Sequence, residues 1–102
     1  MNIILETPGF KVSPNLEQVV HDKIKKLFEM APQIIRAEVT LYEGADGNIQ
    51  NRYCVIRLVV PGNDYFVKKN TDAYEKSIEE AQEALQSMIR RDKAKEISNR
   101  RH

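Results

Sequence analysis

The chain has 102 residues, of which 41% are hydrophobic and 30% are charged, and its formal net charge is +1. These values predict one globular domain that removes roughly two-thirds of its surface from water, with no room for a second domain. No apolar stretch approaches the roughly 20 residues that span a membrane, and the segment from Met1 to Leu5 is too short for a secretory signal and lacks its basic flank. We therefore expect a cytoplasmic protein without a membrane partner.

Charge is distributed unevenly along the chain. Residues 90–102 hold six basic and two acidic side chains, a net charge of +4, whereas residues 1–89 hold ten basic and thirteen acidic ones, a net charge of −3. Shortly before the basic end comes an acidic cluster of Glu75, Glu79, Glu80 and Glu83. Acidic residues early in a helix and basic residues late in it stabilise that helix through its dipole. The same polarisation is typical of a surface that binds phosphates or another acidic partner.

The N-terminal third predicts a strand followed by a helix. Residues 2–6 are rich in β-forming residues, and a Pro8-Gly9 turn follows them. Ser13 is suited to cap the helix, and Pro14 fits its first position because the missing N–H would have no partner there. Pro32 ends the helix. Its apolar residues recur every three or four positions and form one stripe that must face a core: Leu16, Val19, Val20, Ile24, Leu27 and Phe28.

Three more strands follow the first helix. Residues 37–42 alternate between apolar and polar, and residues 54–60 do the same after a polar loop at 44–51. Pro61-Gly62 fits the centre of a type II turn, since proline presets the first φ and glycine allows the positive second φ. A fourth strand over residues 64–69 is therefore expected to pair antiparallel with the third.

The closing helix is predicted to begin at Asp72, with Glu75 at the spacing of a capping box. It covers the sheet with an apolar stripe of Tyr74, Ile78, Ala81, Leu85 and Met88. Ser98 and Asn99 favour its end, so we expect fraying after about Lys95. The element order predicts an α+β fold, βαβββα, with a four-stranded sheet and two helices packed on one face. We assign this domain to residues 1–97 and a mobile basic tail to residues 98–102.

The sequence offers little for catalysis. It has no nucleophile elbow, phosphate-binding loop, zinc-protease motif or cysteine pair. His21 lies on the polar side of the first helix and His102 is terminal, so neither has partners for metal binding or general-base work. Cys54 is the sole cysteine and lies in an apolar strand, which predicts a buried, reduced thiol. We expect no enzyme activity, no metal, no cofactor and no small-molecule substrate.

Basic side chains are the remaining candidates for function. If the two helices lie side by side, these residues form one stripe that follows a phosphate backbone. The candidate RNA-binding residues are Lys23, Lys25, Lys26, Lys68, Lys69, Arg90, Arg91, Lys93 and Lys95. The predicted strands lack the paired aromatic platform with which RNA-recognition motifs read bases, so RNA shape and phosphates are the expected targets. The alternative is a protein-interaction module whose charge-polarised C-terminal helix binds an acidic protein.

Several short segments are each common in proteins, but their order and spacing along the chain are specific when taken together. They are Met1-Asn2-Ile3, Lys23 to Leu27, Ala37 to Leu41, Leu58 to Gly62, and Thr71 to Ile78 with Leu85 and Arg90 to Lys93 beyond it. On these segments, which cover nearly all of residues 1–95, the chain resembles the ribosome hibernation promoting factor and ribosome-associated inhibitor family, once labelled sigma-54 modulation proteins. The long form of that family adds a second, dimerising domain, and this chain resembles the short form.

The resemblance implies a protein that docks on the small ribosomal subunit at the decoding region, occludes messenger and transfer RNA, and silences ribosomes in stationary phase or stress. It implies rRNA contacts from the helices, here Lys23, Lys25, Lys26, Arg90, Arg91, Lys93 and Lys95. The chain departs from the family at Leu85 to Ile89, where Ser87 replaces an arginine of the family's Leu-x-Arg-Gln-Leu pattern, and in its low net charge. We expect a translation inhibitor whose partners are the small subunit and its rRNA.

Overall fold

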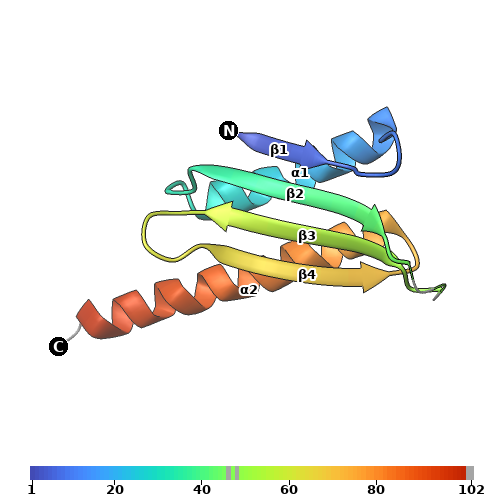
Figure 1. Ribbon diagram of the computed structural model, residues 1–102. Helices are drawn as coiled ribbons and strands as arrows, with labels where there is room; N and C mark the ends of the chain where they lie inside the picture. Colours follow the sequence, from blue (N-terminus) through green and yellow to red (C-terminus); the bar gives the residue numbers. More distant parts are fainter. Residues whose placement is uncertain (46, 48, 101–102) are drawn as a thin grey trace.

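The computed structural model describes residues 1–45, 47 and 49–100 of the chain, and side chains as far as Ala94. The elements in chain order are β1 (Ile3–Glu6), α1 (Pro14–Met30), β2 (Arg36–Glu43), β3 (Arg52–Val59), β4 (Tyr65–Thr71) and α2 (Tyr74–Arg100). The strands form one sheet in the order β1-β2-β3-β4, in which β1 and β2 are parallel and the other pairs are antiparallel. Both helices lie on one side of the sheet (Figure 1). The predicted βαβββα fold is confirmed.

The start of α1 follows the predicted capping pattern. The Ser13 side chain accepts a hydrogen bond from the Leu16 N–H at 3.1 Å, and Pro14 occupies the first helical position. The inner stripe is also confirmed, since Val20, Ile24 and Leu27 are almost completely buried. Burial of this stripe fixes the rotation of α1 and turns the side chains of the intervening positions toward solvent.

Alternation along the strands separates the two faces of the sheet. Ala37, Val39 and Leu41 of β2 and Cys54, Ile56 and Leu58 of β3 are fully buried beneath the helices, as predicted. Burial raises the pKa of the Cys54 thiol to about 12, which keeps it protonated at neutral pH. No helix in the described part of the chain is both long and apolar enough to cross a bilayer.

The open face of the sheet carries an aromatic pair that the sequence analysis did not anticipate. Tyr42 and Tyr53 are paired across β2 and β3, and their rings stack with centroids 4.9 Å apart and an interplanar angle of 3°. The Lys68 ammonium lies 5.1 Å from the Tyr53 ring centroid. This pair was not predicted, because only the cross-strand register brings the two rings together. The rings stack on each other, and the prediction that the sheet has no base-reading platform of the RNA-recognition-motif kind stays a prediction.

The turn between β3 and β4 matches its prediction. Gly62 has a φ of 99°, the positive value that the second central position of a type II turn requires. Asp64, which follows the turn, stabilises it by hydrogen bonds to residues that precede the turn. Its carboxylate accepts hydrogen bonds from the Arg57 guanidinium at 2.6 and 2.9 Å and from the Val60 N–H at 3.3 Å.

The start of α2 differs from the prediction. The helix begins at Tyr74, and its first main-chain bond runs from the Ser77 N–H to the Ala73 carbonyl at 3.1 Å, so Ala73 is the N-cap. Asp72 lies one residue too early to cap the helix, and its carboxylate pairs instead with the Lys76 ammonium at 3.1 Å. The Thr71 hydroxyl accepts from the Ala73 N–H at 3.2 Å.

The length of α2 also differs from expectation. The helix continues to Arg100, through the Ser98-Asn99 pair where fraying was expected, since each of these residues disfavours a helix by less than about 0.7 kcal/mol. Residues 101 and 102 of the predicted mobile tail lie outside the described residues, and the mobility of that tail stays a prediction. Toward the core, Ile78, Ala81 and Leu85 are fully buried as predicted, and Ile89 extends the buried stripe by one more turn.

Candidate nucleic-acid interface

Two contacts fix how α1 and α2 lie against each other. The Gln82 side chain donates a hydrogen bond to the Lys23 carbonyl at 3.3 Å, and the Lys93 ammonium donates one to the Met30 carbonyl. Residue numbers increase in the same direction along both helices, so the helices run parallel. Their C-terminal halves, which hold most of the predicted cations, therefore lie side by side.

Four of the predicted cations are exposed at this end of the helical layer. Ile24 and Leu27 of α1 and Ile89 of α2 point into the core, which turns their neighbours outward. These neighbours are Lys25, Lys26, Arg90 and Arg91, all exposed, and none of them forms an ion pair with another residue that the structure describes. Lys23 lies beside the contact between the helices and is half-buried. Four free cations and one partly covered cation thus share one end of the layer.

Lys93 has a structural partner within the protein. The last turn of α1 contains no basic residue, and the Lys93 ammonium supplies a cation to the carbonyl of Met30, where that helix ends. The neighbouring Asp92 accepts a hydrogen bond from the Tyr65 hydroxyl at 2.6 Å, which ties α2 to β4. The two contacts hold the basic part of α2 against the rest of the domain, and sequence reasoning anticipated neither of them.

The two lysines of β4 lie on opposite sides of the sheet. Successive side chains of a strand alternate between the faces, so Lys68 lies on the open face over Tyr53, whereas Lys69 borders a groove on the helical side with Glu80 and Glu83. Lys68 is therefore not part of a stripe along the helices, contrary to the sequence-based prediction. The side chain of Lys95 lies outside the described residues.

Acidic residues occupy the other end of the helical layer. Glu75, Glu79, Glu80 and Glu83 are all exposed along the N-terminal half of α2. Within the described residues there is no group of three or more histidine, cysteine, aspartate or glutamate side chains that could hold a metal ion. The helical layer is thus acidic at one end and basic at the other, and the net charge of +1 conceals this separation.

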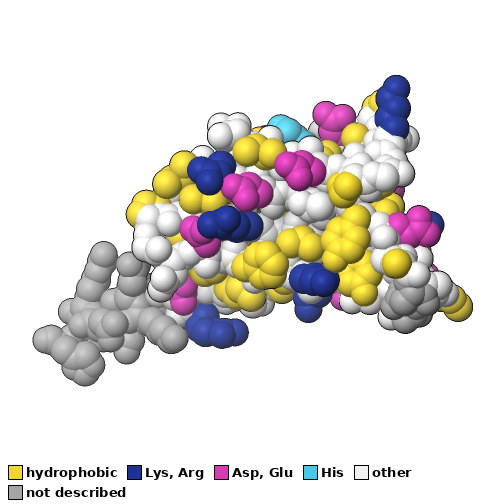
Figure 2. All heavy atoms as spheres, viewed as in Figure 1, with side chains coloured by type: hydrophobic (Ala, Val, Ile, Leu, Met, Phe, Trp, Pro, Cys, Tyr) yellow, Lys and Arg dark blue, Asp and Glu magenta, His cyan; other side chains and the backbone are white. Residues whose placement is uncertain are grey.

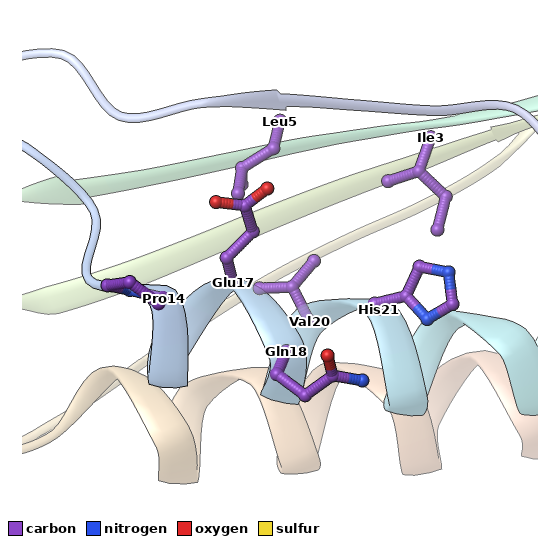
Figure 3. A pocket seen from close by; sticks show the side chains of 7 residues that line it. All are labelled: Ile3, Leu5, Pro14, Glu17, Gln18, Val20 and His21. Atoms are coloured by element: carbon purple, nitrogen blue, oxygen red, sulfur yellow. The ribbon is translucent and has the colours of Figure 1, made fainter.

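A shallow groove between β1 and α1 is lined partly by apolar side chains (Figure 3). Glu17 and His21 extend from α1 toward β1, the Ile3 and Leu5 side chains of β1 point toward the helix, and Gln18 points away from the strand (Figure 3). The closest charged partner of the His21 ring is Asp22, at 3.9 Å and exposed. This arrangement lacks the paired groups that nucleophilic or general-base catalysis requires.

These features define a small α+β domain in which Lys25, Lys26, Arg90 and Arg91 are exposed together on the helical layer rather than in an enclosed pocket. The protein family described as "Sigma 54 modulation protein / S30EA ribosomal protein" matches residues 3–97. The chain belongs to this family, and the resemblance noted in its sequence is confirmed. No curated protein matches the chain significantly.

Solved structures share the fold of this chain. One is a structure of a ribosomal subunit interface protein from Coxiella burnetii, with a TM-score of 0.80 and 17% identity, covering 92% of this chain and 99% of that one. Another is the N-terminal domain of Thermus thermophilus Protein Y, with a TM-score of 0.75 and 21% identity, covering 89% of this chain and 98% of that one. Both are similar to this chain across nearly their whole length.

Proposed function

We propose that this protein is a translation inhibitor that binds the small ribosomal subunit near the decoding region and promotes ribosome hibernation under stress. The observation that carries the proposal is the family match over residues 3–97, and the similar fold of a ribosomal subunit interface protein supports it. A binding protein of this kind acts in the cytoplasm, where ribosomes are, and needs no catalytic group.

Phosphate contact by the basic end of the helical layer is the proposed mode of binding. Lys25 and Lys26 are exposed on α1, and Arg90 and Arg91 are exposed on the adjacent half of α2. Arginine forks pair with two phosphate oxygens at once, and lysines act as mobile point charges. Lys23 adds a fifth cation at the junction. Because the acidic end of α2 is repelled by the same phosphates, the polarity of the layer also orients the protein on RNA.

Salt dependence of binding to purified small subunits tests this mode. If four or five cations neutralise phosphates, the logarithm of the association constant should fall with the logarithm of salt concentration with a slope of about 3 to 4. Changing Arg90 and Arg91 together to Gln should weaken binding and lower the slope by about 1.5. Lys76→Gln, on the acidic half of the same helix, is the matched control and should change the slope little.

Two outcomes would contradict the proposal. A slope near zero would exclude phosphate contacts, and binding to an acidic ribosomal protein stripped of RNA would favour a protein-interaction module instead. The decoding-region location has its own test, because messenger and transfer RNA bound beforehand should compete with the protein. If such subunits bind the protein as tightly as empty ones, the site lies elsewhere.

A further inference from the structure

The sheet face opposite the helices is uncovered and mixes apolar and charged side chains. Ile4 on β1 is 42% exposed and Phe66 on β4 is 58% exposed, although both are large hydrophobic residues. Figure 2 looks onto this face and shows hydrophobic side chains gathered over its middle, with Lys, Arg, Asp and Glu side chains among them. Exposed aromatic and aliphatic side chains next to paired charges are typical of a surface that meets another protein.

The strand register arranges these side chains in rows across the sheet. One row reads from β1 to β4 as Glu6, Thr40, Val55 and Lys68. The next row reads Ile4, Glu38, Arg57 and Phe66. The two residues at the opposite edges of each row are complementary in chemistry. The first row has an acid at one edge and a base at the other, and the second row has an aliphatic side chain at one edge and an aromatic one at the other.

A two-fold axis parallel to the strands turns these rows into contacts between two copies. Such an axis places β1 of one copy over β4 of the other and β2 over β3. The position of each row along the strands is unchanged, so each row lies over the same row of the other copy. Glu6 then meets Lys68, Ile4 meets Phe66, and Glu38 meets Arg57, each contact occurring twice. We propose that the open sheet face is a self-complementary surface on which two copies of this chain pair face to face.

The charges on this face favour a second copy over RNA. Arg57 is paired with Asp64 at 2.6 Å, and Arg36 is paired with Glu38 at 2.8 Å, so neither guanidinium is left free for a phosphate. Glu6 and Lys68 form no ion pair with any residue that the structure describes, and they carry opposite charges at opposite edges. The face therefore has no excess of positive charge to attract RNA. Lys68, whose ammonium lies over the Tyr53 ring, and Glu6 are the charges without an ion pair among the described residues, and they can neutralise each other between copies.

The geometry of sheet packing agrees with this pairing. Aligned sheets pack about 10 Å apart with their strands rotated by roughly 30°. That rotation shifts the edge strands by about 3 to 4 Å along their length, a distance that Glu, Lys and Phe side chains can span.

A face of four strands offers roughly 500 Å² per copy, less than the about 800 Å² of a standard interface. We therefore expect a weak dimer with a dissociation constant of roughly 10 to 500 µM.

Sedimentation velocity of nucleic-acid-free protein across this concentration range tests the proposal with charge reversals at exposed positions. The wild type should shift from monomer toward dimer as its concentration rises. Glu6→Lys alone and Lys68→Glu alone should each weaken dimerisation at least tenfold, because each creates two like-charge contacts. A mixture of the two variants should recover dimers, since every edge contact between the different chains is again between opposite charges.

Recovery in the mixture separates pairing from misfolding, because a misfolded variant would not be rescued by its partner. Lys76→Glu on α2 makes the same charge change on the helical side and should leave the dimerisation constant unchanged. A wild type that stays monomeric at about 1 mM would overturn the proposal. So would two variants that each dimerise like the wild type, a mixture that stays monomeric, or a face that binds single-stranded oligouridine while the protein remains monomeric. The inference does not depend on the proposed ribosome contact, which lies on the other side of the domain.

Discussion

Lys93 of α2 donates a hydrogen bond to the main-chain carbonyl of Met30, the last residue of α1. The final carbonyls of a helix have no partner within the helix and carry a partial negative charge. A lysine from the neighbouring helix meets that charge, because the last turn of α1 has no basic residue. The contact joins the two helices at the end of the layer where the exposed cations lie.

Removal of this contact should therefore affect stability as well as binding. Lys93→Gln is expected to lower the free energy of unfolding by about 0.5 to 2 kcal/mol, the range for a charged group at a helix C-terminus. Arg91→Gln, at an exposed residue without an ion pair, should change it by less than about 0.5 kcal/mol. Urea denaturation of both variants measures the difference. Equal stabilities would show that the lysine contributes no more than a solvent-exposed cation.

Core truncations test the register that turns the cations outward. Leu27 and Leu85 are both fully buried, and truncating either to Ala should cost about 2 to 5 kcal/mol, because methyl groups are lost and a cavity remains. Lys26→Ala, one position from Leu27 and exposed, should cost little. Thermal or urea unfolding checks all three variants. A Leu85→Ala variant as stable as Lys26→Ala would contradict the observed rotation of α2.

Acid stability should depend on Asp64. The hydrogen bond from Arg57 holds the pKa of Asp64 below its usual value of 3.8 in the folded protein. A lowered pKa in the folded state means that this carboxylate stabilises the fold above the unfolded pKa and that its contribution is lost as pH falls through the folded pKa. The stability difference between wild type and Asp64→Asn should thus be largest at neutral pH and shrink below about pH 4.

Unfolding curves recorded from pH 7 down to pH 2 measure that difference. Asp22→Asn is a suitable control, because Asp22 is exposed on α1 and accepts its hydrogen bond from Gln18 rather than from a guanidinium. If the difference in free energy of unfolding between wild type and Asp64→Asn stays constant from pH 7 to pH 2, the ion pair with Arg57 does not stabilise the turn.

Cys54 should react with thiol reagents only when the sheet opens. The side chain is fully buried, and its pKa of about 12 leaves almost no reactive thiolate at neutral pH. Labelling with a chromogenic disulfide should therefore proceed at the rate of local or global opening and should accelerate in Leu85→Ala. Rapid labelling of the native wild type, at the rate of a free thiol in solution, would contradict the observed burial.

The sequence predicted the fold because its strongest patterns are local. The stripe through Ile24 and Leu27, the alternation through Cys54, and the Pro61-Gly62 turn each follow from neighbouring residues, and all three are observed. The cap of α2 was predicted at Asp72, one residue before the observed N-cap Ala73, whose carbonyl accepts the first main-chain bond of the helix. The two possible starts differ only in which of these carbonyls accepts that bond, and the local sequence pattern does not separate them. Short-range patterns decide the type of an element more reliably than its ends.

The candidate site was less predictable because it depends on contacts distant in sequence. Nothing near Lys93 indicates that its ammonium binds the Met30 carbonyl, and nothing near Tyr42 indicates that its ring stacks on Tyr53. Strand alternation could have separated Lys68 from Lys69 before the structure was known, since adjacent residues of a strand face opposite ways. The exposed positions of Lys25, Lys26, Arg90 and Arg91 did follow from the helical stripes.

The connectivity of the sheet also bears on the order in which the domain assembles. β2 and β3 are joined by the loop at 44–51 and β3 and β4 by the turn at Pro61-Gly62, whereas β1 reaches β2 only after the chain has passed through the whole of α1. Closing the loop between β1 and β2, which contains α1, costs more chain entropy than closing the other two connections. This cost comes before the Ile3–Ala37 pairing can stabilise the sheet. We therefore expect the three-stranded meander with α2 to form the nucleus of folding, and the N-terminal strand to dock onto it afterwards.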